Sequence, residues 1–371
     1  MKLRLKRNVI VWLKVIGGIC AVFLIGYLIY AKQISNFTNL GYSKAASKVI
    51  LFSGNKEFVL SVGENKTLNA AFESKDYRDK YLSNYAKIKY QKQENIIKNI
   101  NTLLDKGYSN NDVSIILAHG NDKDVTEFTK RDRIKYLEEF YQYPYAKLKN
   151  YDRYIKYTDE TGEDEKTTVI HVNLNMDKEK YVDFEYVDKY SFDMLVNKYR
   201  SMGEDMEPDD LVKISDDYTE KEEFYGNKVA VNALIQMFEA AKIDGLEMVV
   251  NSAYRSYKEQ EETAEFYRKW YGDNYVTNYV AKPGFSEHQT GLAFDIGSTS
   301  KNVFVESKEY EWMLENAHKY GFILRFSKKG EVITGFRSEP WHYRYVGKDI
   351  AKYIYEHKIT FEEYYVMFLD K

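Results

Sequence analysis

The segment FSEHQTGLAFD, residues 285–295, places a histidine, a glycine and an aspartate around a short apolar run. If its last five residues form a strand, Gly291, Ala293 and Asp295 face one side, because successive side chains of a strand alternate. His288 comes just before this strand, so its ring can fold back to meet the Asp295 carboxylate. Two interpretations are open. The segment is either a loop that enters a core strand with two polar residues of no special role, or part of a metal site whose small residues leave space for the ion.

A second segment, EPWH at residues 339–342, offers a third possible ligand in His342 and a further carboxylate in Glu339. Two histidines and one aspartate leave a fourth position for water, which is the arrangement of a catalytic zinc ion. A nearby glutamate that does not bind the metal is then the expected base. Residues three apart on a straight strand face opposite sides, so we expect a turn at Pro340 that brings Glu339 and His342 together. The sequence therefore predicts a site for one zinc ion.

The remaining histidines have no ligand-type residue at a recognisable spacing: His119, His171, His318 and His357. His171 lies in a segment that alternates like a strand, and we expect it to be structural. The single cysteine, Cys20, lies in an apolar stretch, so neither a disulfide framework nor a cysteine-based zinc site is predicted. A net charge of −3 without a long basic stripe argues against a nucleic-acid partner.

The N-terminal region has the composition of a membrane anchor. Residues 9–31 are apolar apart from Lys14, and residues 15–31 carry no charge, so the segment can cross the ~30 Å hydrocarbon layer of a bilayer. The basic residues ahead of it predict a cytoplasmic N-terminus and an extracytoplasmic remainder; they are Lys2, Arg4, Lys6 and Arg7. A cleaved signal peptide is the alternative, but LIYAKQ is a poor cleavage site. We therefore expect residues 1–32 to form a cytoplasmic tip and a single-pass transmembrane helix.

An internal repeat follows the anchor. GYSKAASKVILFSGN at residues 41–55 aligns without gaps with GYSNNDVSIILAHGN at residues 107–121. In each copy a serine can cap the start of a helix, an apolar stripe follows, and Gly-Asn can end the helix. We expect a helical domain over residues 33–165, which is either a spacer or a module that binds the wall or a partner protein.

Strand and linker patterns connect this domain to the C-terminal region. TTVIHVNLNM at residues 167–176 predicts a strand and GEDMEPDDLVKI at residues 203–214 a turn-rich linker, both within a connecting region at 166–220. In the C-terminal domain, residues 221–371, helices are expected at 230–245, 256–271 and 307–321, and strands at 246–252, 292–296, 322–326 and 339–347. The expected class is α+β, with a mostly antiparallel sheet flanked by helices.

The full pattern S-x-H-x-x-G-x-A-x-D followed by E-x-W-H resembles the VanY-type D-alanyl-D-alanine carboxypeptidases. These are zinc metallopeptidases of the lysostaphin, D-Ala-D-Ala peptidase and hedgehog-like fold group. The resemblance covers most of residues 190–365 and includes VNKYRSM, EPDDLVKI, SAYRSYKEQ, AKPGFSEHQTGLAFDIGS and ITGFRSEPWHYRYVG. Lys282 stands where an arginine is commoner, a change that keeps the charge at a position that binds no metal. The repeat lies outside the resemblance.

The resemblance implies a role for each motif residue. The zinc ligands would be His288, Asp295 and His342, with Glu339 as the catalytic base. Ser286 and Gln260 would line the substrate pocket, and Arg255 would be a catalytic and substrate-binding residue that holds the terminal carboxylate of the substrate. A guanidinium fork is suited to that task, because it binds a carboxylate through two hydrogen bonds. Trp341 and Tyr343 are equally well explained by core packing.

The function implied is that of a membrane-anchored, extracytoplasmic zinc D,D-carboxypeptidase. It would remove the C-terminal D-alanine from peptidoglycan stem peptides through attack of a zinc-activated water, with Glu339 as general base. Three alternatives stay open: an L,D-carboxypeptidase acting on tetrapeptide stems, a peptidoglycan endopeptidase, and a wall-binding protein without catalysis. Arg255 argues against the endopeptidase, because an internal bond presents no terminal carboxylate.

Overall fold

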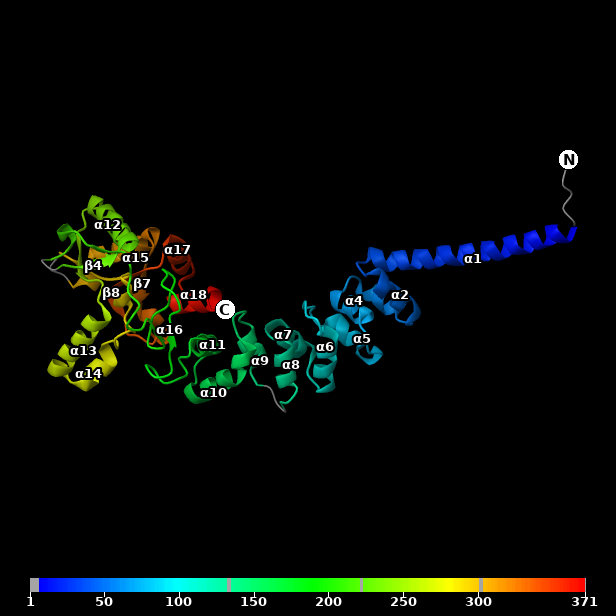
Figure 1. Ribbon diagram of the computed structural model, residues 1–371, viewed down its shortest axis with the longest axis horizontal. Coiled ribbons are helices and arrows are strands. Elements are labelled where there is room, and N and C mark those ends of the chain that lie inside the picture. Colours follow the sequence, from blue (N-terminus) through cyan, green and yellow to red (C-terminus); the bar gives the residue numbers. More distant parts are fainter. Residues whose placement is uncertain (1–6, 132–134, 221–222, 300–302, 371) are drawn as a thin grey trace. The chain divides into compact units, whose positions relative to one another are not determined.

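The chain divides into two units, Met1–Tyr141 and Gln142–Lys371 (Figure 1). The structure, a computed structural model, describes residues 7–131, 135–220, 223–299 and 303–370. Three of the N-terminal basic residues, Lys2, Arg4 and Lys6, lie outside the described residues. The expected domain boundary at residue 165 lies inside the second unit.

The first unit begins with a long apolar helix, α1 (Arg7–Asn39). Its segment Val9–Asn39 is long and apolar enough to cross a membrane, although a signal sequence near an N-terminus has the same properties. The C-terminal part of the helix belongs to the fold, because Phe37 is buried and α1 contacts α2 (Lys44–Phe52).

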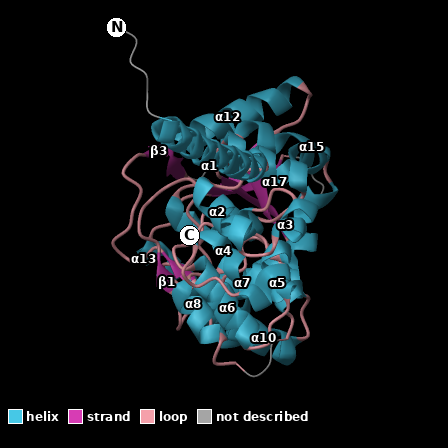
Figure 2. Cartoon of the chain, turned by 90° about the vertical axis from the view of Figure 1, so that its right-hand side faces the viewer, coloured by secondary structure: helices cyan, strands magenta, loops and turns pink. Residues whose placement is uncertain are grey.

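The rest of the first unit is helical over its described residues, as the repeat predicts, and the strands in Figure 2 belong to the second unit. The two copies share their local bonds. Ser43 caps α2 and Ser109 caps α7, while the hydroxyl groups of Tyr42 and Tyr108 donate to backbone carbonyls 21 and 20 residues further on. The other helices are α3 (Lys56–Val62), α4 (Lys66–Glu73), α5 (Leu82–Lys87), α6 (Ile96–Asp105), α7 (Asn110–His119), α8 (Asp122–Phe128) and α9 (Leu137–Tyr141).

The strand predicted at residues 167–176 is wrong, because the structure has helix α11 (Glu165–Asn173) there. Asp164 caps this helix through the Thr167 amide, and the six residues from Thr167 to Val172 are all buried. A helix buried on all sides shows no polar face, so its β-branched residues imitate the pattern of a strand. His171 is buried and bonded to Tyr157 and to two backbone carbonyls, as expected for a structural residue.

The hydrogen bonds show that the repeat continues into α11. The Tyr85 hydroxyl accepts from the Arg78 amide and donates to Asn101. In the same way the Tyr154 hydroxyl, in α10 (Tyr151–Thr161), accepts from the Lys147 amide and donates to Asn173. The helical region therefore reaches the end of α11.

A four-stranded antiparallel sheet forms the centre of the second unit, which confirms the predicted α+β class. The strands are β5 (Met248–Ser252), β6 (Ala293–Ser298), β7 (Phe322–Phe326) and β8 (Glu339–Tyr345), in the order β5-β6-β8-β7. Two small sheets precede it. One pairs β1 (Glu185–Tyr186) with β2 (Arg200–Ser201) in parallel, and the other pairs β3 (Leu211–Lys213) with β4 (Tyr225–Asn227).

Three helices lie where the sequence predicts them: α12 (Lys228–Ile243), α13 (Tyr257–Tyr271) and α15 (Lys308–Asn316). The other helices of this region are α14 (Asp273–Tyr279), α16 (Glu331–Thr334), α17 (Lys348–His357) and α18 (Phe361–Phe368). Phe294 and Ile296 of β6 join one buried cluster with α12. In a second cluster, Ile170 of α11 packs with Ile323 of β7. These clusters fix β6 and β8, whose side chains form the site.

Candidate metal centre

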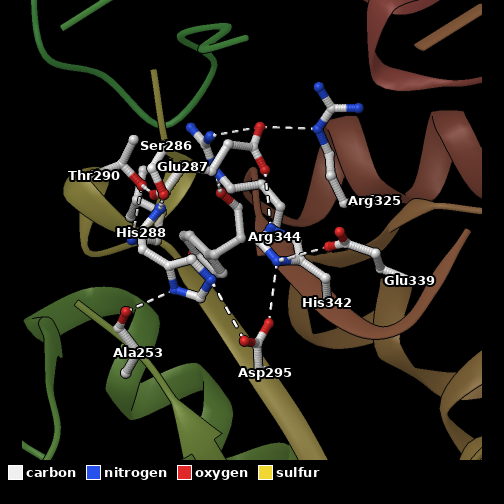
Figure 3. A network of polar contacts seen from close by, with 12 residues as sticks. Ala253, Ser286, Glu287, His288, Thr290, Asp295, Arg325, Glu339, His342 and Arg344 are labelled. Carbon is white, nitrogen blue, oxygen red and sulfur yellow. Dashed lines mark hydrogen bonds and ion pairs between the residues drawn. The ribbon is translucent and has the colours of Figure 1, made fainter. Parts of the chain in front are cut away.

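Three neighbouring elements bring the three predicted ligands together (Figure 3). His288 lies on a short 3-10 turn, Glu287–Thr290, directly before β6. Asp295 of β6 is paired with His342 of β8 in the strand register. One ligand atom from each of the three side chains lies within 4.8 Å of the others. The turn folds the His288 ring back toward Asp295, as the H-x6-D spacing predicts.

His288 is held in a form that can bind a metal. Its Nδ1 is 2.7 Å from the carbonyl oxygen of Ala253, and a carbonyl can only accept, so Nδ1 carries the proton and donates. The other nitrogen, Nε2, lies 3.5 Å from Oδ2 of Asp295. Burial lowers the pKa of His288 to about 4, so the ring is neutral near pH 7 and Nε2 offers its lone pair.

His342 lies between two carboxylates. Its Nδ1 is 3.1 Å from Oδ1 of Asp295 and its Nε2 is 3.3 Å from Oε2 of Glu287. Burial alone would lower the pKa of His342, but the bonds to Asp295 and Glu287 outweigh it and raise the pKa to about 10. Without a metal the ring is therefore protonated near pH 7. A metal bound at Nδ1 must displace that proton, while Nε2 continues to donate to Glu287.

The donor set fits zinc. Zinc bonds to histidine nitrogen and carboxylate oxygen are about 2.0–2.2 Å long, so tetrahedral ligand atoms lie about 3.3 Å apart. Oδ1 of Asp295 is 3.1 Å from His342 Nδ1 and Oδ2 is 3.5 Å from His288 Nε2, so each ring nitrogen lies near one carboxylate oxygen at about that spacing. Both histidines are oriented by their second nitrogen, as metal-binding histidines usually are.

Glu339 lies beside the ligands without joining them. Its Oε2 is 3.7 Å from Nδ1 of His342, and burial raises the pKa of its carboxyl. The predicted turn at Pro340 is wrong, because β8 runs through this residue from Glu339 to Tyr345. Instead, the pairing with β7 is irregular, with Tyr343 opposite Leu324 and Glu339 opposite Phe326. The extra residues of β8 form a bulge, which turns Glu339 to the same side as His342.

Gly291 does not have the role expected for it. It has a φ of +65° and ends the 3-10 turn before β6 begins. A Cβ at this position would lie 3.0 Å from Cδ2 of Leu211 and 3.1 Å from the amide nitrogen of Asn227. The glycine is therefore required by the backbone conformation and by close packing against the segments that carry Leu211 and Asn227. It does not clear space for the ion.

The predicted substrate residues share a cavity with the ligands. Arg255, Gln260 and Ser286 line a cavity of about 550 Å³ together with the three ligands and Glu339. The Arg255 guanidinium donates to Oε1 of Gln260 at 2.9 Å and to Oγ of Ser252 at 3.2 Å. The Gln260 amide in turn donates to the carbonyl of Ala281. Ser286 accepts from the amide of His288. The structure thus brings all the predicted site residues to one place.

The sequence reasoning missed a buried ion-pair network behind His342 (Figure 3). Oε1 of Glu287 accepts from Arg325 Nε at 2.8 Å and from Arg344 at 3.1 Å. Arg325 also forms two bonds with Glu362. Burial alone would raise the pKa of Glu287, but the two arginines and His342 outweigh it and hold that pKa well below its usual range. The signal was present in FILRF and WHYRY, because an arginine in an apolar strand needs a buried partner.

Comparisons with known proteins agree with this site. The family model described as VanY, D-alanyl-D-alanine carboxypeptidase, matches residues 224–348. The bifunctional D-Ala-D-Ala dipeptidase and D-Ala-D-Ala carboxypeptidase VanXYC of Enterococcus gallinarum is 33% identical over 180 residues, which cover 46% of this chain and 92% of that protein. The chain belongs to the VanY family. Its VanY region contains every predicted site residue.

Two other relatives contain further residues outside the region that matches this chain. The Bacillus subtilis (strain 168) protein YodJ, named as a carboxypeptidase, is 42% identical over 179 residues, which cover 46% of this chain and 66% of that protein. The match to a D-alanyl-D-alanine carboxypeptidase from Enterococcus faecalis spans 52% of that enzyme.

Solved structures are also similar in sequence to this chain. The LdcB LD-carboxypeptidase is 41% identical, with a TM-score of 0.47, over 50% of this chain and 92% of that chain. A Zn(II) complex of the D,D-pentapeptidase VanY from a VanB-type resistance cassette is 32% identical, with a TM-score of 0.40, over 47% of this chain and 99% of that chain.

Proposed function

We propose that the protein is a zinc D,D-carboxypeptidase that removes the terminal D-alanine from peptidoglycan stem peptides. The observation that carries the proposal is the position of Arg255. It lies in one cavity with the three ligands and Glu339, so a cation that can bind a terminal carboxylate is near the groups that can hydrolyse the preceding bond. The names of the VanY relatives support the same reaction.

His288 Nε2, Asp295 and His342 Nδ1 would hold the ion. Bound there, zinc would polarise the scissile carbonyl and lower the pKa of a bound water. Asp295 also contributes a negative charge. Burial alone would raise the pKa of its carboxyl, but the two histidines lower it, so the carboxylate is ionised and available as a ligand.

Glu339 is the proposed base. Its carboxylate is near His342 but makes no short bond to it, so it can accept the proton of the attacking water and pass it to the departing amine of D-alanine. A pKa raised by burial suits both steps, because a base is most effective when its pKa approaches the working pH.

Arg255 is proposed to select the chain end. Gln260 and Ser252 already orient its guanidinium, so little side-chain freedom is lost when a carboxylate binds. An endopeptidase cuts an internal bond, so its substrate has no terminal carboxylate for this guanidinium to bind. The arrangement therefore favours a carboxypeptidase over an enzyme that cuts inside stems or cross-bridges.

An L,D-carboxypeptidase acting on tetrapeptide stems is a second candidate. The specific observation in its favour is the 41% identity to the LdcB LD-carboxypeptidase. The two reactions differ in the configuration of the residue before the scissile bond, and both require the same metal, base and carboxylate-binding groups.

Matched stem peptides distinguish the two reactions. The full chain, loaded with zinc in detergent, would be given a pentapeptide ending in D-Ala-D-Ala and a tetrapeptide ending in a single D-Ala, with Glu339→Gln as the matched inactive control. Release of D-alanine from the pentapeptide alone supports the proposal, and release from the tetrapeptide alone assigns the second candidate. Absence of release from both, with zinc bound, would contradict both and favour cleavage of intact wall or a binding role.

We also propose that α1 anchors the enzyme in the membrane, with the catalytic unit outside. The exposed apolar segment Val9–Asn39 supports this location. Alkaline carbonate extraction tests it: an anchored protein stays in the membrane pellet, and a processed protein is released at a lower mass.

A further inference from the structure

Helix α2 carries an exposed apolar surface that packing inside the protein does not explain. This surface, the α2 face, consists of residues three or four apart, which lie on one side of a helix: Ala45, Lys48, Val49 and Phe52. Phe52 is 79% exposed and Val49 is 40% exposed. An aromatic ring this exposed, beside other apolar groups, indicates a contact with something outside the chain.

The second repeat copy shows that the repeat itself does not require this surface. Its matching positions in α7 are Asn111, Ser114, Ile115 and Ala118, so an alanine replaces Phe52. There Asn111 donates to Glu138 and Ser114 accepts from the amide of Lys89, while the exposed end of the matching side carries only the small Ala118. The exposed aromatic ring is therefore particular to the copy that follows α1.

Phe52 of α2 lies beside one end of the apolar part of α1. Its ring stacks against Tyr30, with ring centroids 6.5 Å apart. The charge-free part of α1, residues 15–31, is about 26 Å long at ~1.5 Å per residue, close to the thickness of the hydrocarbon layer. Tyr30 lies near its C-terminal end, two residues before Lys32. Tyrosine and tryptophan are enriched at such positions, at the membrane–water interface.

We propose that the α2 face lies in the outer interfacial layer of the bilayer that α1 crosses. Val49 and Phe52 enter the boundary between headgroups and acyl chains, and Lys48 extends its ammonium group to the headgroups. The proposal rests on the anchor proposed above. It goes further, because contacts on two helices fix how the first unit is oriented on the membrane, whereas a single spanning helix leaves it free to rotate.

The single cysteine of the chain provides a direct test. Cys20→Ala gives a cysteine-free full-length protein, into which Phe52→Cys, Val49→Cys or the matched Ala118→Cys is introduced and spin-labelled. The labelled proteins are reconstituted into phosphatidylethanolamine–phosphatidylglycerol vesicles. Collision rates with oxygen, which partitions into lipid, and with a water-soluble nickel chelate are then measured. Labelled wild-type Cys20, inside the charge-free part of α1, is the reference for a position in lipid.

We expect the labels at positions 52 and 49 to collide with the nickel chelate several-fold less often than the label at position 118, and with oxygen more often. Equal nickel collision rates at 52 and 118, with Cys20 shielded, would overturn the proposal and leave the anchor intact. If Cys20 is also open to nickel, the anchor and the α2 face fail together. The nickel measurement is repeated in native membranes. If the label at position 52 is shielded from nickel there but not in the lipid vesicles, the α2 face binds a protein partner and the lipid proposal is rejected. D-alanine release from soluble peptides is independent of these outcomes.

Discussion

Replacing Glu287 by glutamine tests the buried network behind the metal centre. The carboxylate is fully enclosed, with its residue 5% exposed, and it has three partners: Arg325 Nε at 2.8 Å, Arg344 at 3.1 Å and His342 Nε2 at 3.3 Å. Glutamine keeps the shape of the side chain and removes its charge. Glu362 still neutralises Arg325, but Arg344 loses the carboxylate that faces it, and His342 keeps Asp295 alone.

The expected cost follows from this geometry. Removing one partner of a buried ion pair destabilises a protein by about 3–5 kcal/mol, because the remaining charge stays buried without compensation. The same change removes the group that orients His342. Losing such a partner of a metal ligand typically weakens metal binding about 10- to 100-fold. We therefore expect Glu287→Gln to lower the unfolding free energy by about 3–5 kcal/mol and to raise the zinc dissociation constant by one to two orders of magnitude.

Urea unfolding of the metal-free full chain in detergent measures the first effect, and competition with a zinc-binding dye measures the second. Asp273→Asn is the control, since its pair with Arg268 is exposed and should cost less than about 1 kcal/mol. If Glu287→Gln unfolds like Asp273→Asn and binds zinc like the wild type, the network has neither the stabilising nor the orienting role inferred here.

Three further predictions concern the chemistry. Glu339→Gln should retain zinc and lose about 10²- to 10⁴-fold in kcat, the usual contribution of a general base; a wild-type kcat would exclude Glu339 from proton transfer. Arg255→Met should lower kcat/KM on a free-acid peptide roughly 10- to 100-fold, as expected for losing a charged hydrogen bond. On the matching peptide with a C-terminal amide, the variant should have the same kcat/KM as the wild type. An equal loss on both substrates would contradict carboxylate recognition. Zinc affinity should rise about tenfold per pH unit between about pH 6 and about pH 8. The neighbouring carboxylates raise the pKa of His342 to about 10, so its ring carries a proton that must leave when zinc binds. Calorimetry that shows a pH-independent zinc affinity would contradict this displacement.

The sequence was sufficient for the ligand cluster because its members act through short spacings. His288 and Asp295 flank a single turn and the start of one strand, and only His342 comes from a distant segment. The E-x-W-H motif identified that segment. The mostly antiparallel sheet was predicted from the mixture of helix and strand segments along the C-terminal domain.

Other features depend on contacts that no local pattern encodes. Helix α11 resembles a strand in sequence because packing covers it on all sides. The position of Glu339 depends on a bulge opposite Leu324 and Phe326, which periodicity cannot reveal. The Glu287 network joins residues from four separate segments: the turn before β6, strands β7 and β8, and helix α18. The arginines in two apolar strands could therefore signal a buried pair without identifying the partner.

Zinc titration of D-alanine release tests the central claim most directly. The metal-free full chain would be given increasing zinc with a stem pentapeptide as substrate, and released D-alanine would be measured. The account predicts that activity rises linearly and reaches a plateau at one zinc per chain, and that His342→Ala shows neither tight binding nor release. Release that is unchanged by metal removal, or one zinc bound with no release from penta- or tetrapeptides, would contradict it.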